Sequence, residues 1–267
     1  MIIGQKRLLN QINQYNIDTF PRTTMFIGER GIGKHTFVNV VKDEILKLPL
    51  IDLTTCLSNE VIDEIYINPT PCIYLIDTTK LVDAKQNAIL KLIEEPPVGA
   101  FIILLAEEGV SLLNTVRNRC VVFEFEPYTK DELRTFITNE TDVNLILNIL
   151  RTPGKIIGTN INNLKEAYEI ADKIVHKLAA ANYANTLTIS DKINFEDNYN
   201  KIDLEIFFDV LADHMFKCYY NENDSKILDM YLFTVNARKT LTKDPRTKRE
   251  HFFENFITEL WLKVRGG

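Results

Sequence analysis

A glycine-rich segment near the start of the chain has the residue types and spacing of a phosphate-binding loop. Gly28, Gly31, Gly33 and Lys34 lie in the string GERGIGK, which fits the pattern GxxxxGK. Glycines let the backbone curl so that successive N–H groups point at one spot, and the lysine can reach the β- and γ-phosphates of a nucleotide. The segment follows an apolar run and precedes a helical pattern, as the motif requires. It therefore predicts a cradle for phosphate.

The position after the lysine departs from the pattern. His35 stands where a working loop has Ser or Thr, whose hydroxyl oxygen is a ligand for Mg²⁺. Imidazole suits softer metals. Thr36 does not simply replace the hydroxyl, because one helical step turns it about 100° away. We count His35 and Thr36 among the candidate nucleotide-site residues, but we expect ATP to bind weakly or not at all. The sequence leaves Mg²⁺ binding open and predicts no metal site of its own.

The second chemical segment is CIYLID at residues 72–77, an apolar run that ends in Asp77. An apolar strand with a terminal Asp is the Walker B pattern, in which the carboxylate holds the magnesium shell. ATPases of this kind follow the Asp with a Glu, which orients the attacking water. Here Thr78 takes that place, and its hydroxyl cannot accept a proton near neutral pH. Asp77 alone is also compatible with a simple turn residue at a strand end.

Hydrophobic patterning around these segments predicts an α/β domain. Short apolar runs alternate with helical patterns, which indicates a parallel sheet with flanking helices. We expect strands at 24–27, 50–53, 72–76, 101–106 and 121–125, and helices at 34–46 and 82–95. Pro96 and Pro97 end the second helix.

After Pro127 we expect only helices. Thr129 and Glu132 form a capping-box pattern, and helical patterns follow at 143–150, 163–183, 204–220, 225–240 and 248–264. We therefore predict an α/β domain at 1–126, a helical lid at 127–162 and a helical collar domain for oligomerisation at 163–267. Flexible stretches are expected at 186–201 and 242–247.

Composition narrows the possible functions. The formal net charge of -6 excludes a strongly basic footprint over the whole chain, although a local basic patch stays open. The 4 cysteines are far apart, which favours reduced, buried thiols rather than a disulfide framework or a short-spaced zinc site. The sequence contains neither a signal-peptide pattern nor an apolar run of about 18 residues. We expect a soluble cytoplasmic protein with no membrane partner.

Several segments share the pattern of one protein family. They are Ile3-Gly-Gln-Lys6, GERGIGKH at 28–35, CIYLID at 72–77, NAILKLIEEPP at 87–97 and TVRNRC at 115–120. Together they resemble the clamp-loader AAA+ family, in particular the delta-prime-like subunits of bacterial DNA polymerase III. LKLIEEPP followed by RNRC is the most specific part. Thr152-Pro-Gly-Lys155 resembles the lid-helix signature of the non-catalytic subunits, and beyond residue 160 the resemblance is weak.

The resemblance implies roles for individual residues. Gly28 to Lys34 would be the family's phosphate loop, and Asp77 its Walker B aspartate. Arg119 stands at the arginine of the family's SRC motif, so it would be a finger that reaches the nucleotide of a neighbouring subunit and stabilises charge on the transferring phosphoryl group. Without the family, Arg119 is an arginine just before a buried strand, which is compatible with a structural salt bridge.

Departures from the family pattern point away from hydrolysis. Asn118 replaces the serine of SRC, and Glu107 stands at the sensor position after the strand at 101–106, where a carboxylate would repel the γ-phosphate. Gly154 falls where active relatives have the sensor-two arginine. The zinc-binding cysteine module of bacterial relatives is absent from this sequence.

We therefore predict a non-catalytic, delta-prime-like subunit of a sliding-clamp loader. Its expected partners are other clamp-loader subunits through the C-terminal helices, the sliding clamp, and primer-template DNA. Lys80, Lys85 and Lys91 could face DNA phosphates or simply solvent. The alternatives are a self-sufficient AAA+ ATPase (a catalytic clamp-loader subunit or a helicase loader), with Thr36 and Glu94 taking over the missing roles, and a structural adaptor outside replication.

Overall fold

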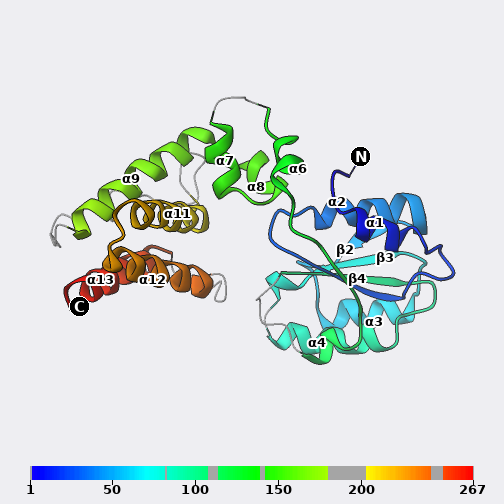
Figure 1. Ribbon diagram of the computed structural model, residues 1–267. Helices are drawn as coiled ribbons and strands as arrows, with labels where there is room; N and C mark the ends of the chain where they lie inside the picture. Colours follow the sequence, from blue (N-terminus) through cyan, green and yellow to red (C-terminus); the bar gives the residue numbers. More distant parts are fainter. Residues whose placement is uncertain are drawn as a thin grey trace. The chain divides into compact units, whose positions relative to one another are not determined.

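The structure is a computed structural model that describes residues 2–81, 83–107, 114–138, 142–179, 203–241 and 249–266. The chain divides into two compact units (Figure 1). The first contains Met1–Phe136 and Thr152–Lys155, and the second contains Ile137–Arg151 and Ile156–Gly267. The further division of the helical part into a lid and a collar stays a prediction.

The first unit is built on a parallel sheet of 5 strands in the order β2-β3-β4-β1-β5. The strands are β1 (Thr23–Ile27), β2 (Leu50–Asp52), β3 (Ile73–Asp77), β4 (Phe101–Ala106) and β5 (Val121–Glu124). All five occur where the apolar runs predict them. The three central strands, β3, β4 and β1, are almost wholly buried, as a parallel sheet covered on both faces requires.

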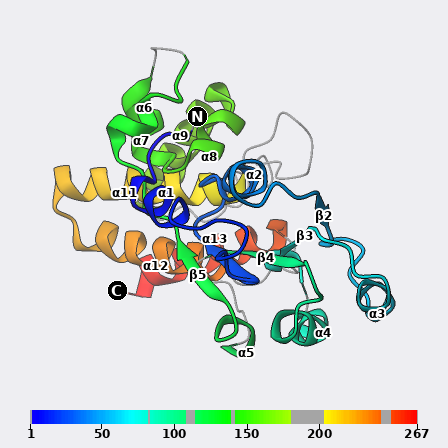
Figure 2. The same cartoon turned by 90° about the vertical axis from the view of Figure 1, so that its right-hand side faces the viewer.

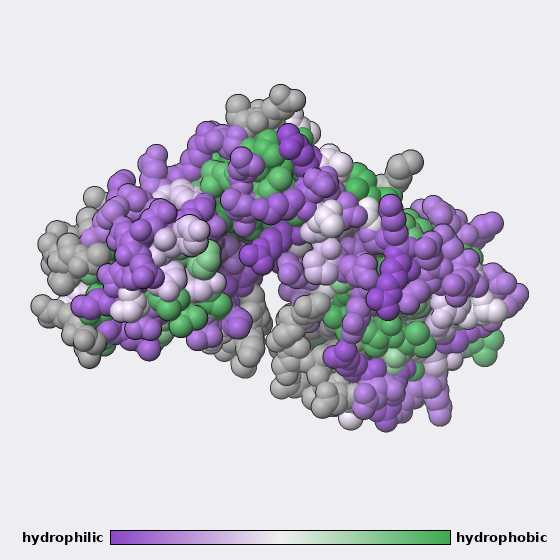
Figure 3. Space-filling model, viewed as in Figure 1, coloured by the Kyte–Doolittle hydropathy of each residue, from purple (hydrophilic) through white to green (hydrophobic). Residues whose placement is uncertain are grey.

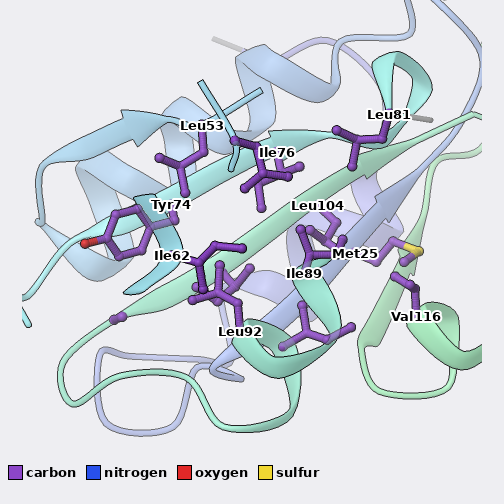
Figure 4. Packing of buried hydrophobic residues seen from close by; sticks show 14 of the residues in the cluster. Met25, Leu53, Ile62, Tyr74, Ile76, Leu81, Ile89, Leu92, Leu104 and Val116 are labelled. Atoms are coloured by element: carbon purple, nitrogen blue, oxygen red, sulfur yellow. The ribbon is translucent and has the colours of Figure 1, made fainter. Parts of the chain in front are cut away.

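Helices cover the two faces of this sheet (Figure 1). On one side lie α1 (Lys6–Ile12), α2 (Lys34–Val40) and a π-helical continuation (Val41–Leu46), whose apolar side chains pack with those of β1 and β4. On the other side lie α3 (Asn59–Ile67) and α4 (Asp83–Glu94). Figure 4 shows Ile62 of α3 and Leu92 of α4 packing on this second face.

Two of these helices, α1 and α3, are missing from the sequence prediction. α1 is short, and it starts after two residues in the left-handed region, Gly4 at φ 70° and Gln5 at φ 52°. α3 begins at a Ser58 cap whose Oγ accepts a hydrogen bond from the Val61 N–H. The two helices have 7 and 9 residues and bury two apolar side chains each, so each offers only about two turns of pattern in the sequence.

The capping box predicted at Thr129 is confirmed. α6 (Lys130–Arg134) begins with the Glu132 N–H donating to the Thr129 hydroxyl, while the Thr129 N–H donates to the Glu132 carboxylate at 2.8 Å. These two bonds satisfy end donors that would otherwise lack helical partners.

The second unit is helical throughout its described part, as predicted. Its helices are α7 (Val143–Ile149), the second half of α8 (Pro153–Gly158), α9 (Ile161–Ala179), α11 (Leu204–Glu222), α12 (Ser225–Leu241) and α13 (Arg249–Gly266). α11 runs beside α12 in both views (Figure 2). Aromatic side chains join α11 to α13, with the rings of Phe208 and Phe256 4.6 Å apart. The predicted flexible stretches at 186–201 and 242–247 lie outside the described residues.

The hydrophobic core of the protein lies inside it, away from the surface. The face drawn in Figure 3 is mostly hydrophilic, with scattered hydrophobic groups. Among the described helices, none is both long enough and apolar enough for a membrane span. All 4 cysteines are free, as predicted, but burial is uneven, because Cys72 is buried and Cys56 is exposed. In the described part of the chain, no group of three or more His, Cys, Asp and Glu residues could hold a metal ion.

An ion-pair cluster links α11 to α12. The Arg238 guanidinium donates to Glu205 Oε2 at 3.1 Å and to Asp209 Oδ1 at 3.1 Å. The Arg238 and Glu205 side chains are each 17% exposed, so water screens this pair poorly. Removal of the arginine would take this positive charge away from two carboxylates that lie one turn apart on α11.

We expect Arg238→Ala to lower the free energy of unfolding by about 2–4 kcal/mol, because an uncompensated, partly buried carboxylate pair is costly. Lys226→Ala, at an exposed position of the same helix, is the control and should change it by less than about 0.5 kcal/mol. Urea unfolding of the full chain measures both. An Arg238→Ala protein as stable as the Lys226→Ala protein would show that the pair contributes nothing.

Candidate nucleotide site and arginine finger

The carboxyl ends of the central strands bring the predicted chemical segments to one edge of the sheet. In register, Ile27 of β1 pairs with Ala106 of β4, and Asp77 of β3 pairs with Leu105. The Gly28 N–H donates to the Ala106 carbonyl at 3.3 Å. Gly28, Asp77 and Glu107 therefore follow or end three adjacent strands, which is where parallel sheets place their ligand sites.

The glycine-rich loop adopts a conformation that needs its glycines. Gly31 and Gly33 have φ angles of +80° and +107°, in the left-handed region that side chains disfavour. Gly28 is required for a different reason, because a Cβ there would lie 2.9 Å from Phe125 Cβ. The three glycines singled out from the sequence are thus each demanded by the local structure.

Lys34 bonds to its own loop. Its Nζ donates to the Gly28 carbonyl at 2.6 Å and to the Glu29 carbonyl at 3.0 Å, and the residue is 8% exposed. Two of the three ammonium donors of Lys34 therefore serve backbone carbonyls of the loop.

The next three carbonyls of the loop also accept hydrogen bonds from within the first unit. The Thr152 hydroxyl donates to the Arg30 carbonyl at 3.0 Å, and the Gly154 N–H donates to the Gly31 carbonyl at 2.8 Å. The Tyr128 hydroxyl donates to the Ile32 carbonyl at 3.3 Å. Every carbonyl from residue 28 to residue 32 thus has a donor from the same chain.

Sequence reasoning missed Tyr128 and Thr152 as loop contacts. The Thr152-Pro-Gly segment stood out as a lid-helix signature. Gly154 in this segment and Gly31 in the loop could have indicated that two backbones approach closely. Tyr128 carries no comparable signal. Burial raises the pKa of the Tyr128 phenol, a hydrogen bond with Gln5 lowers it by less, and the Glu132 carboxylate adds a smaller rise, so the hydroxyl keeps the proton that it donates.

Gly31 and Gly154 pack backbone against backbone. A Cβ on Gly154 would lie 2.7 Å from Gly31 Cα and 2.9 Å from the Gly31 carbonyl oxygen. The segment 152–155 therefore contacts the loop at a distance that no side chain permits.

The two residues after Lys34 point away from the protein interior. His35 and Thr36 are both exposed on the first turn of α2. Neither places an oxygen beside Lys34 in the manner that a Mg²⁺ shell requires: His35 has no oxygen in its side chain, and Thr36 lies one helical step on. The donor set around the loop does not fit a magnesium-nucleotide complex.

Asp77 and Thr78 are used in local structure. Asp77 Oδ1 accepts the Thr79 N–H at 3.1 Å and the Thr79 hydroxyl at 2.6 Å, which caps the short 3-10 helix Thr78–Lys80. The Thr78 hydroxyl donates to the Leu105 carbonyl at 2.8 Å, and Thr78 is 3% exposed. The residue in the place of the water-orienting glutamate is therefore bonded into the sheet.

Arg119 lies just beyond α5 (Asn114–Arg117), at the start of the turn into β5. Its Nε donates to the Glu94 carboxylate at the end of α4, and its Nη1 donates to the Thr115 carbonyl at 2.8 Å. The Arg119 side chain is 38% exposed. The neighbouring Cys120 anchors the turn, and burial raises the pKa of its thiol to about 12, so it stays protonated.

Glu107 and the predicted lysines complete the set of residues singled out from the sequence. Glu107 follows β4 directly, at the sensor position, and is partly exposed. Lys91 on α4 contacts the ring of Tyr66 at 4.5 Å and pairs with Asp63 at 3.9 Å. The side chains of Lys80 and Lys85 lie outside the described part of the chain.

Comparison with known proteins finds a matching family model and relatives of this chain. The family model for the DNA polymerase III delta subunit matches residues 51–129, the stretch that contains Asp77, Glu94 and Arg119. The delta′ subunit of DNA polymerase III from Escherichia coli is 34% identical over 68 residues, which are 26% of this chain and 20% of that protein. Over these residues the chain is similar to the clamp-loader AAA+ family.

Further relatives of this chain come from Buchnera aphidicola. A DNA polymerase III gamma subunit from the Schizaphis graminum symbiont is 25% identical over 170 residues, covering 51% of this chain and 47% of that protein. A delta′ subunit from the Acyrthosiphon pisum symbiont is 29% identical over 188 residues, covering 63% and 54%. The chain thus spans about half the length of these two relatives.

A solved structure has the same fold as this chain. A gamma subunit-related DNA polymerase III protein from Thermotoga maritima matches with a TM-score of 0.52 and 13% identity, covering 97% of this chain and 100% of that chain. The likeness supports the predicted fold class, an α/β AAA+ domain followed by helices.

We expect Gly154→Ala to destabilise the protein by about 1–3 kcal/mol, because the added methyl overlaps the loop backbone. Gly158→Ala is the matched control on the same helix, since nothing lies within 4 Å of its Cβ. That change should be neutral or stabilise by up to about 1 kcal/mol. Denaturant unfolding, with hydrogen exchange of the amides from Gly31 to Lys34, compares the two. Equal stability and exchange would refute the contact.

Proposed function

We propose that the chain is a non-catalytic, delta-prime-like subunit of a DNA polymerase sliding-clamp loader. It supplies Arg119 to the nucleotide of a neighbouring ATPase subunit while the clamp is loaded on primed DNA. Its own loop from Gly28 to Lys34 keeps the shape of a phosphate cradle, and any ATP there binds weakly.

One observation carries the non-catalytic part. The positions that would manage phosphate, metal and water in an active site serve the fold itself: Lys34 bonds loop carbonyls, Asp77 caps a turn, and Thr78 bonds β4. A bound nucleotide would have to displace the hydrogen bonds of Lys34 and Asp77. Even then Thr78 could not act as a general base. This supports a subunit that does not hydrolyse ATP by itself.

The trans-acting part rests on Arg119. Its guanidinium is partly exposed on the unit that carries the sheet, and it lies within the stretch matched by the family model. An arginine that reaches a neighbour's phosphoryl group stabilises transition-state charge without any chemistry in its own subunit. Arg119 can therefore matter greatly to an assembly even when the phosphate loop of its own subunit is inactive.

The self-sufficient ATPase is the second candidate, and the contacts weaken it. It needs a displaced acid such as Glu94, but that carboxylate pairs with Arg119. It also needs Thr36 as a magnesium ligand, and Thr36 is exposed on α2. The structural adaptor is the third candidate, and it predicts no effect of Arg119 on a partner's hydrolysis.

The proposed partners follow from the family and from the described surfaces. Other clamp-loader subunits would bind through the C-terminal helices, and the assembly would hold the sliding clamp and primer-template DNA. Lys91 is a poor candidate for DNA contact, because its ammonium already lies over Tyr66 and near Asp63.

Steady-state ATP hydrolysis by the assembly purified with this chain from its native host tests the arginine finger. We expect Arg119→Ala to lower the rate by about 10³-fold or more, the range measured for such fingers. Arg117→Ala is the control, because Arg117 lies two residues before Arg119 and is also exposed. Its own ion pair is with Glu124 of β5. An unchanged rate in the Arg119→Ala assembly would favour the adaptor.

Hydrolysis by the isolated chain separates the first two candidates. We expect no turnover above background with or without primed DNA, because the Thr78 hydroxyl cannot accept a proton from the attacking water. Turnover that disappears on Lys34→Ala would establish the self-sufficient ATPase instead.

A further inference from the structure

The two most specific sequence motifs of the chain meet in space, and an ion pair joins them. Glu94, in the string LKLIEEPP, is the last residue of α4, and Arg119, in RNRC, follows α5. The Glu94 carboxylate accepts a hydrogen bond from Arg119 Nε. The contact joins the ends of two helices that are separated by β4 in the sequence.

The guanidinium of Arg119 is fixed on two edges. Glu94 holds Nε, and the Thr115 carbonyl holds Nη1. Arg119 Nη2 makes no hydrogen bond or ion pair to any residue that the structure describes. Because a guanidinium is planar, fixing two edges also fixes the direction of the third nitrogen.

The local surroundings do not explain a glutamate at position 94. A carboxylate at the C-terminal end of a helix is disfavoured by the helix dipole, which prefers a cation there. Other groups already complete this helix end, since the Tyr66 hydroxyl donates to the carbonyls of Lys91 and Glu95 at 3.0 Å each. The pair with Arg119 is the contact that offsets the unfavourable charge.

The pair acts on orientation more than on stability. The side chains of Glu94 and Arg119 are 44% and 38% exposed, and ion pairs with such exposure contribute little to folding. An arginine loses much rotamer freedom when it is held in one direction, so a partner that has already fixed it lowers the entropy lost when phosphate binds.

We propose that Glu94 is the positioning residue of the arginine finger. It holds Arg119 through Nε so that Nη2 points outward, ready for a phosphate oxygen of the nucleotide on the neighbouring subunit. This inference rests on the proposed trans-acting role of Arg119. Glu94 itself touches no reacting atom and acts only through Arg119.

A double-mutant cycle in the native assembly tests this role. We expect Glu94→Gln to lower the kcat of ATP hydrolysis about 10-fold, the size typical when a group that orients a functional residue is lost. The KM for ATP and the melting temperature should stay unchanged. Glu95→Gln is the matched control, since Glu95 is the next residue, is exposed, and forms no ion pair with a described residue. In the Arg119→Ala background, Glu94→Gln should have no further effect.

The outcomes separate this inference from the proposed function. An unchanged rate with Arg119→Ala would reject the finger itself, and the positioning role with it. A large loss with Arg119→Ala but none with Glu94→Gln would reject the positioning role alone. A loss with Glu94→Gln that persists in the Arg119→Ala background would also reject it, because Glu94 would then act by another route, such as the displaced acid of the self-sufficient ATPase.

Discussion

A loop that aims its N–H groups at one spot must turn its carbonyls the other way, and those carbonyls need hydrogen-bond partners. In this chain all the carbonyls from Gly28 to Ile32 have them. Lys34 serves the first two, and Thr152, Gly154 and Tyr128 serve the next three in order. The loop therefore keeps its shape through contacts made by the protein alone.

That constraint explains which residues around the loop cannot vary freely. Gly31 must be glycine for its φ of +80° and for the approach of Gly154. Segment 152–155 belongs to the sheet-bearing unit, although the flanking residues 137–151 and 156 onward belong to the other unit. A phosphate cradle held in this way can persist after the chemistry is lost, because its conformation serves packing.

Loss of chemistry and retention of structure are separable at the level of single side chains. Asp77 remains useful as a cap for the turn after β3, and Thr78 replaces a charged base with a hydroxyl that bonds the neighbouring strand. Arg119 is different, because its fixed guanidinium has a nitrogen without a partner among the described residues. This geometry supports the proposal that the chain offers a charge to a neighbouring subunit's site.

Much of this was predictable from sequence, and the failures have physical causes. The five strands and the capping box at Thr129 follow from local patterns, and the structure confirms them. The glycines of the phosphate-binding loop were predicted because a positive φ and the close approach of another backbone both favour glycine. Helices α1 and α3 were missed because they bury few side chains. The contacts of Tyr128 with Ile32 and of Glu94 with Arg119 link residues 96 and 25 positions apart, which no local pattern encodes.

Calorimetric titration of the isolated chain with ATP, with and without Mg²⁺, tests the central claim most directly. The claim is that the cradle for phosphate persists without the groups that handle metal and water. Our account predicts weak or undetectable binding that Mg²⁺ leaves unchanged, because neither His35 nor Asp77 presents a ligand set for the ion. Tight binding that strengthens about tenfold or more when Mg²⁺ is added, a gain of about 1.4 kcal/mol, would contradict it.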